Sequence, residues 1–186
     1  MRIRWLPNGI SIFRIFLILP ILFLINARQY KIALVFFIVA VLSDIVDGYL
    51  AKKYDWRSHL GTFLDPLADK LLISSTFIIL AYSGNIPFWL MSAVIFRDIC
   101  IVLGALFYYF FIESIRVKPT GISKLNTVLE SLFVLFILSK LAYGLPGPSV
   151  ILLFGSAVLV TVVISGVDYI ISWSLKVKNF RNTLRN

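Results

Sequence analysis

Six apolar stretches, each about 20 residues long, occupy most of this chain of 186 residues. They cover roughly residues 8–27, 31–53, 62–83, 87–112, 123–142 and 149–173. Turns rich in glycine and proline, at residues 84–87 and 144–148, separate two pairs of these stretches. A helix of about 20 apolar residues crosses the hydrocarbon core of a bilayer, and we find no runs of alternating polarity that would suit membrane-spanning strands. The sequence therefore predicts an all-α integral membrane protein with six transmembrane helices in a single domain, residues 1–186.

The composition excludes several other classes of protein. Hydrophobic residues make up 60% of the chain, charged residues only 15%, and the mean hydropathy is +0.94. A soluble domain carries roughly 25% charged residues, and a globule of this size could not bury so large an apolar excess. We therefore exclude a soluble enzyme, a nucleic-acid-binding protein and a disordered tail.

The basic residues are unevenly distributed between the two sides of the expected helix bundle. The chain has 18 Lys and Arg against 9 Asp and Glu, a net charge of +9. One side holds both termini and most bases; the other holds only Arg28, Lys31 and Lys140. This asymmetry predicts cytoplasmic termini and a cationic face suited to anionic head groups or phosphorylated substrates, although topology alone also explains it. No basic, amphipathic transit segment precedes the first stretch, so we expect a multi-pass protein of a bacterial inner membrane.

Four of the nine acids form two pairs at the cytoplasmic ends of neighbouring helices. Asp44 and Asp47 are three residues apart near the end of the second stretch, and Asp65 and Asp69 are four apart near the start of the third. Each spacing places both side chains of a pair on one face of a helix. Because antiparallel helices joined by a short turn bring these faces together, we expect four carboxylates at one place.

Four carboxylates in a site of low dielectric constant need a counter-charge to stay ionised. Basic side chains would make the cluster a structural ion-pair network, and Lys70 and Arg97 are candidates. Hard divalent cations are the functional alternative: oxygen ligands suit Mg²⁺, Mn²⁺ or Ca²⁺ and argue against zinc, because the single histidine is His59 and the single cysteine, Cys100, is remote. Four carboxylates can hold two such ions for phosphoryl chemistry.

Two glycines accompany the acids. Gly48 directly follows Asp47, and Gly61 precedes Asp65 by four residues. Glycine inside a helix costs about 1 kcal/mol relative to alanine, so its presence at this level indicates close approach of a bulky group such as a nucleotide or diphosphate. Tight helix packing is the alternative explanation.

The complete motif resembles the signature of the CDP-alcohol phosphatidyltransferase family. It runs Asp44-x-x-Asp47-Gly48-x-x-Ala51-Lys52, then eight residues, then Gly61-x-x-x-Asp65-x-x-x-Asp69. One position departs from the family pattern: Lys52 stands where arginine is usual, which keeps the charge but loses the bidentate fork.

The resemblance implies a substrate, a reaction and a set of site residues. The donor would be CDP-diacylglycerol; an acceptor hydroxyl would attack its phosphatidyl phosphorus, and CMP would leave. Asp69 would be the general base. Mg²⁺ or Mn²⁺, two ions per site, would be held by the four acids, Asp44, Asp47, Asp65 and Asp69. The residues implied to contact the donor are Asn8, Asp44, Gly48, Lys52 and Gly61. The resemblance also implies that the protein forms a homodimer and that membrane lipids surround it.

Two further segments resemble one branch of the family, which contains phosphatidylglycerophosphate synthases and CMP-forming cardiolipin synthases. They are Pro7-Asn8-x-x-Ser11-x-x-Arg14 and Lys118-Pro119-Thr120-x-x-Ser123-Lys124-x-Asn126-Thr127. Ser123 and Asn126 replace a glycine and a lysine that are usual in phosphatidylglycerophosphate synthases, so the second segment is more similar to cardiolipin synthases. The residues that we expect to bind the acceptor are Arg14, Arg97, Lys118, Ser123 and Lys124.

The loss of a lysine at position 126 favours an acceptor of low charge. A phosphodiester such as phosphatidylglycerol carries one negative charge, and a phosphomonoester such as glycerol 3-phosphate carries nearly two. We therefore expect phosphatidylglycerol as the acceptor and cardiolipin as the product. Glycerol 3-phosphate, giving phosphatidylglycerophosphate, is the alternative, and another alcohol such as inositol phosphate or serine is a third.

A small cation transporter or channel is a rival interpretation, because acids inside a membrane often mark ion paths. Two observations disfavour it: the acids cluster near one boundary, and the two halves of the chain show no internal repeat. A purely structural protein would not need four acids at fixed spacing.

Overall fold

The structure, a computed structural model, describes residues 6–54, 59–111 and 121–183. Within these ranges it is all helical and contains no strand, as predicted. The six helices are α1 (Leu6–Asn26), α2 (Tyr30–Tyr54), α3 (His59–Tyr82), α4 (Phe88–Phe111), α5 (Gly121–Tyr143) and α6 (Pro148–Thr183).

Each predicted apolar stretch corresponds to one helix, and the largest difference is at the end of α6. The predicted stretch ends at residue 173, but the helix continues to Thr183. The residues after position 173 are more polar yet contain no proline or glycine. A loss of apolar residues ends a membrane span, but it does not by itself end a helix.

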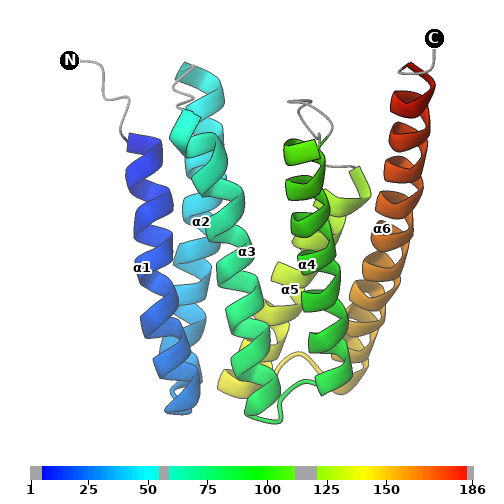
Figure 1. The fold of residues 1–186 in the computed structure, drawn as a ribbon. Helices are drawn as coiled ribbons and strands as arrows, with labels where there is room; N and C mark the ends of the chain where they lie inside the picture. The colour runs from blue at the N-terminus through cyan, green and yellow to red at the C-terminus, as the bar shows by residue number, and fades with distance from the viewer. Residues whose placement is uncertain (1–5, 55–58, 112–120, 184–186) are drawn as a thin grey trace.

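The six helices form a closed ring in space (Figure 1). Going around it, α1 packs against α2, α2 against α5, α5 against α6, α6 against α4, α4 against α3, and α3 against α1. α3 also contacts α5 across the ring. The helices run alternately up and down, so the first turns of α1, α3 and α5 lie at the same end as the last turns of α2, α4 and α6 (Figure 1).

The apolar core fills the opposite half of the bundle, next to the turns that join α1 to α2, α3 to α4 and α5 to α6. Its fully buried members include Ile25 of α1, Phe37 of α2 and Leu80 of α3. Phe77 and Phe133 connect α3 to α5, with ring centroids 5.9 Å apart. The buried charged residues lie above this core, nearer the end where α1 begins.

The turn after α3 closes with a left-handed residue. The Asn85 N–H donates to the Leu80 carbonyl and the Gly84 N–H to the Ala81 carbonyl, both at 2.9 Å, and Gly84 has φ 72°. This pattern satisfies the last carbonyls of the helix, and glycine adopts the left-handed conformation without steric cost. Gly144 occupies the same conformation after α5, with φ 77°.

We predict that Gly84→Ala destabilises the protein by about 1–2 kcal/mol, because a Cβ disfavours the left-handed region. The measurement is thermal unfolding in detergent. Gly166→Ala is the matched control: this glycine is helical, an added Cβ would meet open space, and alanine there should leave the melting temperature unchanged or raise it. Equal melting temperatures for the two variants would contradict the prediction.

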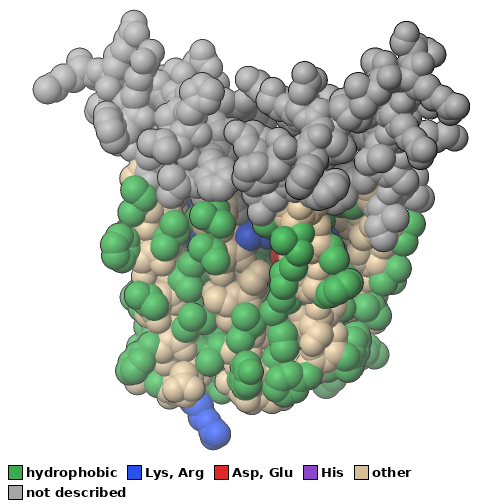
Figure 2. Space-filling model, in the orientation of Figure 1, with side chains coloured by type: hydrophobic (Ala, Val, Ile, Leu, Met, Phe, Trp, Pro, Cys, Tyr) green, Lys and Arg blue, Asp and Glu red, His purple; other side chains and the backbone are tan. Residues whose placement is uncertain are grey.

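The face of the bundle shown in Figure 2 is mainly apolar over its described part, and every helix carries large exposed hydrophobic side chains. Exposed side chains include Phe16, Phe23, Phe96 and Leu152, each with 68–73% of its surface accessible. Apolar surface on this scale marks contact with a membrane or another protein. Among the described residues, the segments Gly121–Tyr143 and Pro148–Tyr169 are long and apolar enough to cross a membrane. Membrane association is thus indicated, while the full six-span topology stays a prediction.

Candidate active site

A buried arginine joins three helices near the middle of the bundle. The Arg14 side chain of α1 is fully buried, and its Nη1 lies 3.0 Å from Asp44 Oδ1 of α2. The same Nη1 donates a hydrogen bond to Asp69 Oδ1 of α3. The two carboxylates, 42% and 28% exposed, therefore converge on one cation. We call these three residues the acid–arginine centre.

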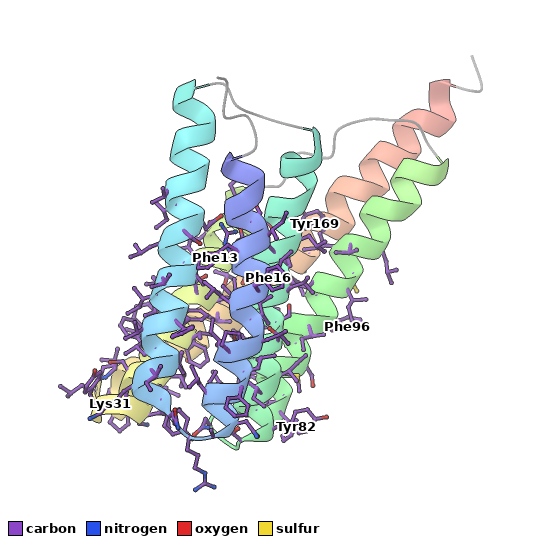
Figure 3. The ribbon with its side chains drawn as sticks, turned by 90° about the vertical axis from the view of Figure 1, so that its left-hand side faces the viewer. Phe13, Phe16, Lys31, Tyr82, Phe96 and Tyr169 are labelled. Atoms are coloured by element: carbon purple, nitrogen blue, oxygen red, sulfur yellow. The ribbon has the colours of Figure 1, made fainter. Side chains whose placement is uncertain are left out.

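The sequence of α1 explains why Arg14 points inward. Ser11, Arg14 and Ile21 are buried at helical spacing, while Phe13 and Phe16, labelled in Figure 3, are on the exposed side. Arg14 thus lies on the buried face of α1, whose exposed face is apolar. A guanidinium at such a position needs anionic partners, because leaving it unpaired away from water is strongly destabilising.

A small cavity of about 40 Å³ adjoins the acid–arginine centre. Asp44 and Asp69 line it together with apolar residues of α2 and α3, and Thr127 and Ser131 of α5 complete the wall. Carboxylate and hydroxyl oxygens are therefore the polar groups that face this cavity.

The other two acids of the motif lie one helical turn nearer the end where α1 begins. Asp47 is in α2 and Asp65 is in α3, but their side chains are outside those that the structure describes. For four residues expected to contact the donor, the structure likewise describes only the helix to which they belong: Asn8, Gly48, Lys52 and Gly61. Among the described residues, no group of three or more potential metal ligands is present.

The described half of the acidic motif fits a divalent cation by its donor chemistry. Asp44 and Asp69 offer oxygen only, which suits Mg²⁺ or Mn²⁺. The Arg14 guanidinium, which contacts both carboxylates, balances only one of their two negative charges, and a bound cation would compensate the other.

A second group of polar side chains lies between α3, α4, α5 and α6. Asp98 Oδ1 accepts hydrogen bonds from Lys70 Nζ at 2.5 Å and from Arg97 Nη1 at 2.7 Å. Arg97 Nη2 donates to Ser123 Oγ at 2.8 Å and to Ser165 Oγ at 2.6 Å. We call these five residues the α3–α6 polar cluster. In Figure 2, basic and acidic side chains come to the apolar surface at one place between α3 and α4.

A buried amide network on α5 and α6 extends this cluster. Asn126 Nδ2 donates to Glu130 Oε1 at 2.6 Å, and Thr161 Oγ1 donates to Asn126 Oδ1 at 2.8 Å. Asn126 and Glu130 are fully buried. Three buried atoms nearby have no hydrogen-bond partner among the described residues: Arg97 Nε, Asp98 Oδ2 and Glu130 Oε2.

The predicted acceptor residues are distributed over different places. Arg97 and Ser123 are hydrogen-bonded in the α3–α6 polar cluster, whereas Arg14 belongs to the acid–arginine centre. Lys124 is exposed on α5, and Lys118 lies outside the described residues.

One expectation about counter-charges needs correction. Lys70 and Arg97 were candidates for neutralising the four-acid motif, but in the structure both pair with Asp98. Arg14, on the opposite side of α3, pairs with Asp44 and Asp69 instead. Sequence reasoning also missed Glu130, whose signal was available: Ser123, Asn126 and Glu130 are spaced by three and four residues and so share one face of α5.

The fold and the site together define a helical bundle with an acidic, oxygen-rich centre next to a second, basic cluster. The family model for CDP-alcohol phosphatidyltransferases matches residues 4–168, which include every residue of both groups. The chain therefore belongs to the CDP-alcohol phosphatidyltransferase family.

Curated relatives fall into two groups by name. Human cardiolipin synthase (CMP-forming) is 38% identical over 146 residues, which is 69% of this chain and 48% of the human protein. A fission yeast cardiolipin synthase (CMP-forming)/mitochondrial hydrolase fusion protein is 34% identical over 97% of this chain and 32% of its own length. CDP-diacylglycerol–glycerol-3-phosphate 3-phosphatidyltransferase of Rickettsia typhi is 30% identical over 80% of this chain and 82% of its own length. The chain thus spans about half or less of these two cardiolipin synthase relatives, but most of the Rickettsia enzyme.

We predict that Asp98→Asn destabilises the protein by about 3 kcal/mol, because Lys70 and Arg97 lose the one carboxylate that both contact. Thermal unfolding in detergent measures the effect. Asp168→Asn in α6 is the matched control at a half-buried acid outside the cluster. A melting temperature for Asp98→Asn equal to that of the control would show that the ion pairs do not stabilise the bundle.

Proposed function

We propose that the protein is a phospholipid-synthesising enzyme that transfers a phosphatidyl group from CDP-diacylglycerol to a glycerol-type acceptor and releases CMP. The single observation that carries this proposal is the convergence of Asp44 and Asp69 on a buried cation beside a cavity, within the segment that the family model matches. The names of both groups of relatives support the same reaction class.

The donor is proposed to bind at the end of the bundle where α2 ends and α3 begins. Two divalent ions, Mg²⁺ or Mn²⁺, held by Asp44, Asp47, Asp65 and Asp69, would neutralise the diphosphate and the charge that develops on departing CMP. The cytidine diphosphate contacts the segments that carry Asn8, Gly48, Lys52 and Gly61.

Asp69 acts as the general base. The acceptor hydroxyl oxygen forms a bond to the phosphatidyl phosphorus, the bond from that phosphorus to the CMP oxygen breaks, and CMP leaves with the electron pair. The hydroxyl proton passes to the Asp69 carboxylate, which needs only hydrogen-bond reach of the hydroxyl. Arg14 orients this carboxylate, since its Nη1 contacts Asp69 Oδ1.

The acceptor is proposed to be phosphatidylglycerol, and the product cardiolipin. Asn126 supports this choice. Its side chain is neutral and is hydrogen-bonded to Glu130 and Thr161 inside the protein, so it brings no positive charge toward an acceptor. Glycerol 3-phosphate is the second candidate, because the Rickettsia enzyme named for that acceptor matches this chain over 82% of its own length.

The proposed setting is a multi-pass protein of a bacterial inner membrane, with six spans, cytoplasmic termini and a homodimeric assembly. The two strongly apolar helical segments and the apolar outer surface support residence in a membrane.

The acceptor is tested by incubating purified protein with CDP-diacylglycerol, Mg²⁺ or Mn²⁺, and either phosphatidylglycerol or glycerol 3-phosphate. We expect CMP release and cardiolipin formation with phosphatidylglycerol, and no CMP release when a chelator removes the metal. Lipid product from glycerol 3-phosphate and none from phosphatidylglycerol would reject the proposed acceptor and establish the second candidate.

The base is tested by Asp69→Asn, an isosteric change that removes the proton-accepting charge. CMP release should fall by about 10²-fold or more, while CDP-diacylglycerol still binds in the presence of divalent metal. Lys140→Gln, which removes a charge at the far end of α5, is the control and should keep full activity. Turnover by Asp69→Asn at the rate of the control would remove Asp69 from the role of base.

A further inference from the structure

An apolar groove of about 400 Å³ lies between α4 and α6, apart from the acid–arginine centre. Its walls include Phe96 and Cys100 of α4 and Val163, Gly166 and Val167 of α6. Phe96, Val163 and Val167 are exposed, so the groove opens on the outer surface of the bundle. Tyr169 lies at its inner side; Figure 3 shows Phe96 pointing away from the bundle and Tyr169 toward it.

Arg97 is the one charged residue that lines this groove among the described residues. Its side chain is almost fully buried, with 3% of its surface accessible. Its Nη atoms are engaged by Asp98, Ser123 and Ser165, but its Nε has no hydrogen-bond partner among the described residues. Arg97 and Lys70 share the single Asp98 carboxylate, so the α3–α6 polar cluster keeps a net positive charge at the inner wall of the groove. This charge favours an anionic group at that place.

A chain of ion pairs connects this arginine of α4 to Lys70 of α3. Arg97 contacts Asp98 at 2.7 Å, and Asp98 contacts Lys70 at 2.5 Å. Lys70 directly follows Asp69 in α3. The order of chemical environments is thus apolar groove, arginine, and then an ion-paired acid and lysine, while Asp69 faces the other side of α3.

We infer that this groove binds one acyl chain of the lipid acceptor, with the phosphodiester of that lipid against Arg97. This inference rests on the proposed function and adds a binding site to it. A phosphatidylglycerol molecule carries its apolar acyl chains next to an anionic phosphodiester. An acyl chain in the groove would place the phosphodiester near Arg97, the one charged residue that lines the groove among the described residues.

Charge complementarity and volume support this occupant. The groove volume falls within the range of roughly 300–1,000 Å³ that is usual for small-molecule sites, and its lining is almost entirely apolar. An anionic head group matches the arginine, whereas glycerol 3-phosphate has no apolar part for the groove. A second copy of this chain is the rival occupant, and the experiment distinguishes it.

Cys100 provides a probe, because it is the single cysteine of the chain, is exposed, and lines the groove. The experiment measures its alkylation rate with a maleimide in detergent micelles containing no added lipid, long-chain phosphatidylglycerol, phosphatidylcholine with the same chains, or glycerol 3-phosphate. Phosphatidylglycerol at ten times its Kd should slow alkylation about tenfold. Phosphatidylcholine should protect less at the same concentration, and glycerol 3-phosphate should not protect.

Gly166→Phe tests the groove directly. An added Cβ at this position meets open space, so the ring can fill the groove without a backbone clash. Protection by phosphatidylglycerol should then disappear, with the alkylation rate within about twofold of the rate of the same variant without lipid. The matched control is Val160→Phe, which adds a ring at an exposed position of α6 outside the groove lining and should keep the protection.

Three outcomes would overturn the inference. Equal protection by phosphatidylglycerol and phosphatidylcholine would mean that the groove does not select an anionic lipid. Protection that persists in Gly166→Phe would place the lipid elsewhere. A Cys100–Cys100 cross-link between two chains, formed equally with and without phosphatidylglycerol, would identify a second copy as the occupant.

The measurement does not depend on turnover, so it separates this inference from the proposed function. If phosphatidylglycerol protects Cys100 but supports no CMP release, the proposed acceptor fails and the lipid site stands. If CMP release occurs with phosphatidylglycerol while Cys100 stays unprotected, the proposed function stands and the groove assignment fails.

Discussion

The interaction on which the site depends is the contact of one buried guanidinium with two carboxylates. Arg14 has no exposed surface, and Asp44 and Asp69 reach it from two other helices. Removing a guanidinium from water is costly unless its charge is neutralised and its donors are bonded. This requirement ties α1, α2 and α3 together at one depth and fixes the position of the carboxylate that we propose as the base.

The acid–arginine centre and the α3–α6 polar cluster lie on two different sides of α3. Asp69 faces α1 and α2, and the next residue, Lys70, faces α4 through its contact with Asp98. Successive residues of a helix are about 100° apart around its axis, so a single helix can present a carboxylate to one group and an ammonium to the other. The donor side and the proposed acceptor side are thus joined by one peptide bond, which sets their relative depth in the membrane without any flexible segment between them.

Much of this could be predicted from the sequence, and the failures have specific causes. The six helices follow from stretches of apolar residues, and the convergence of Asp44 and Asp69 follows from helical spacing and short turns. The counter-charge could not be identified from the sequence. Arg14 is 55 residues from Asp69, and no local pattern predicts that α1 packs against both α2 and α3. Pairing of Lys70 and Arg97 with Asp98 likewise depends on which helices are neighbours. The helical continuation of α6 to Thr183 was not predicted, because hydropathy identifies the apolar part of a helix and does not mark where the helix ends.

The packing of the lower half of the bundle has a consequence for the membrane itself. Below the acid–arginine centre, most of the described side chains buried between the helices are apolar, and the ring centroids of Phe77 and Phe133 lie 5.9 Å apart. The buried Thr76 hydroxyl donates to the Leu72 carbonyl of its own helix. A metal-dependent site with several charges would draw water deep into the bilayer, and a continuous water column would leak protons and dissipate the electrochemical gradient. If charged chemistry takes place at the proposed site, the aromatic and aliphatic layer lies between that site and the opposite end of the bundle, and it would limit the entry of water from that end.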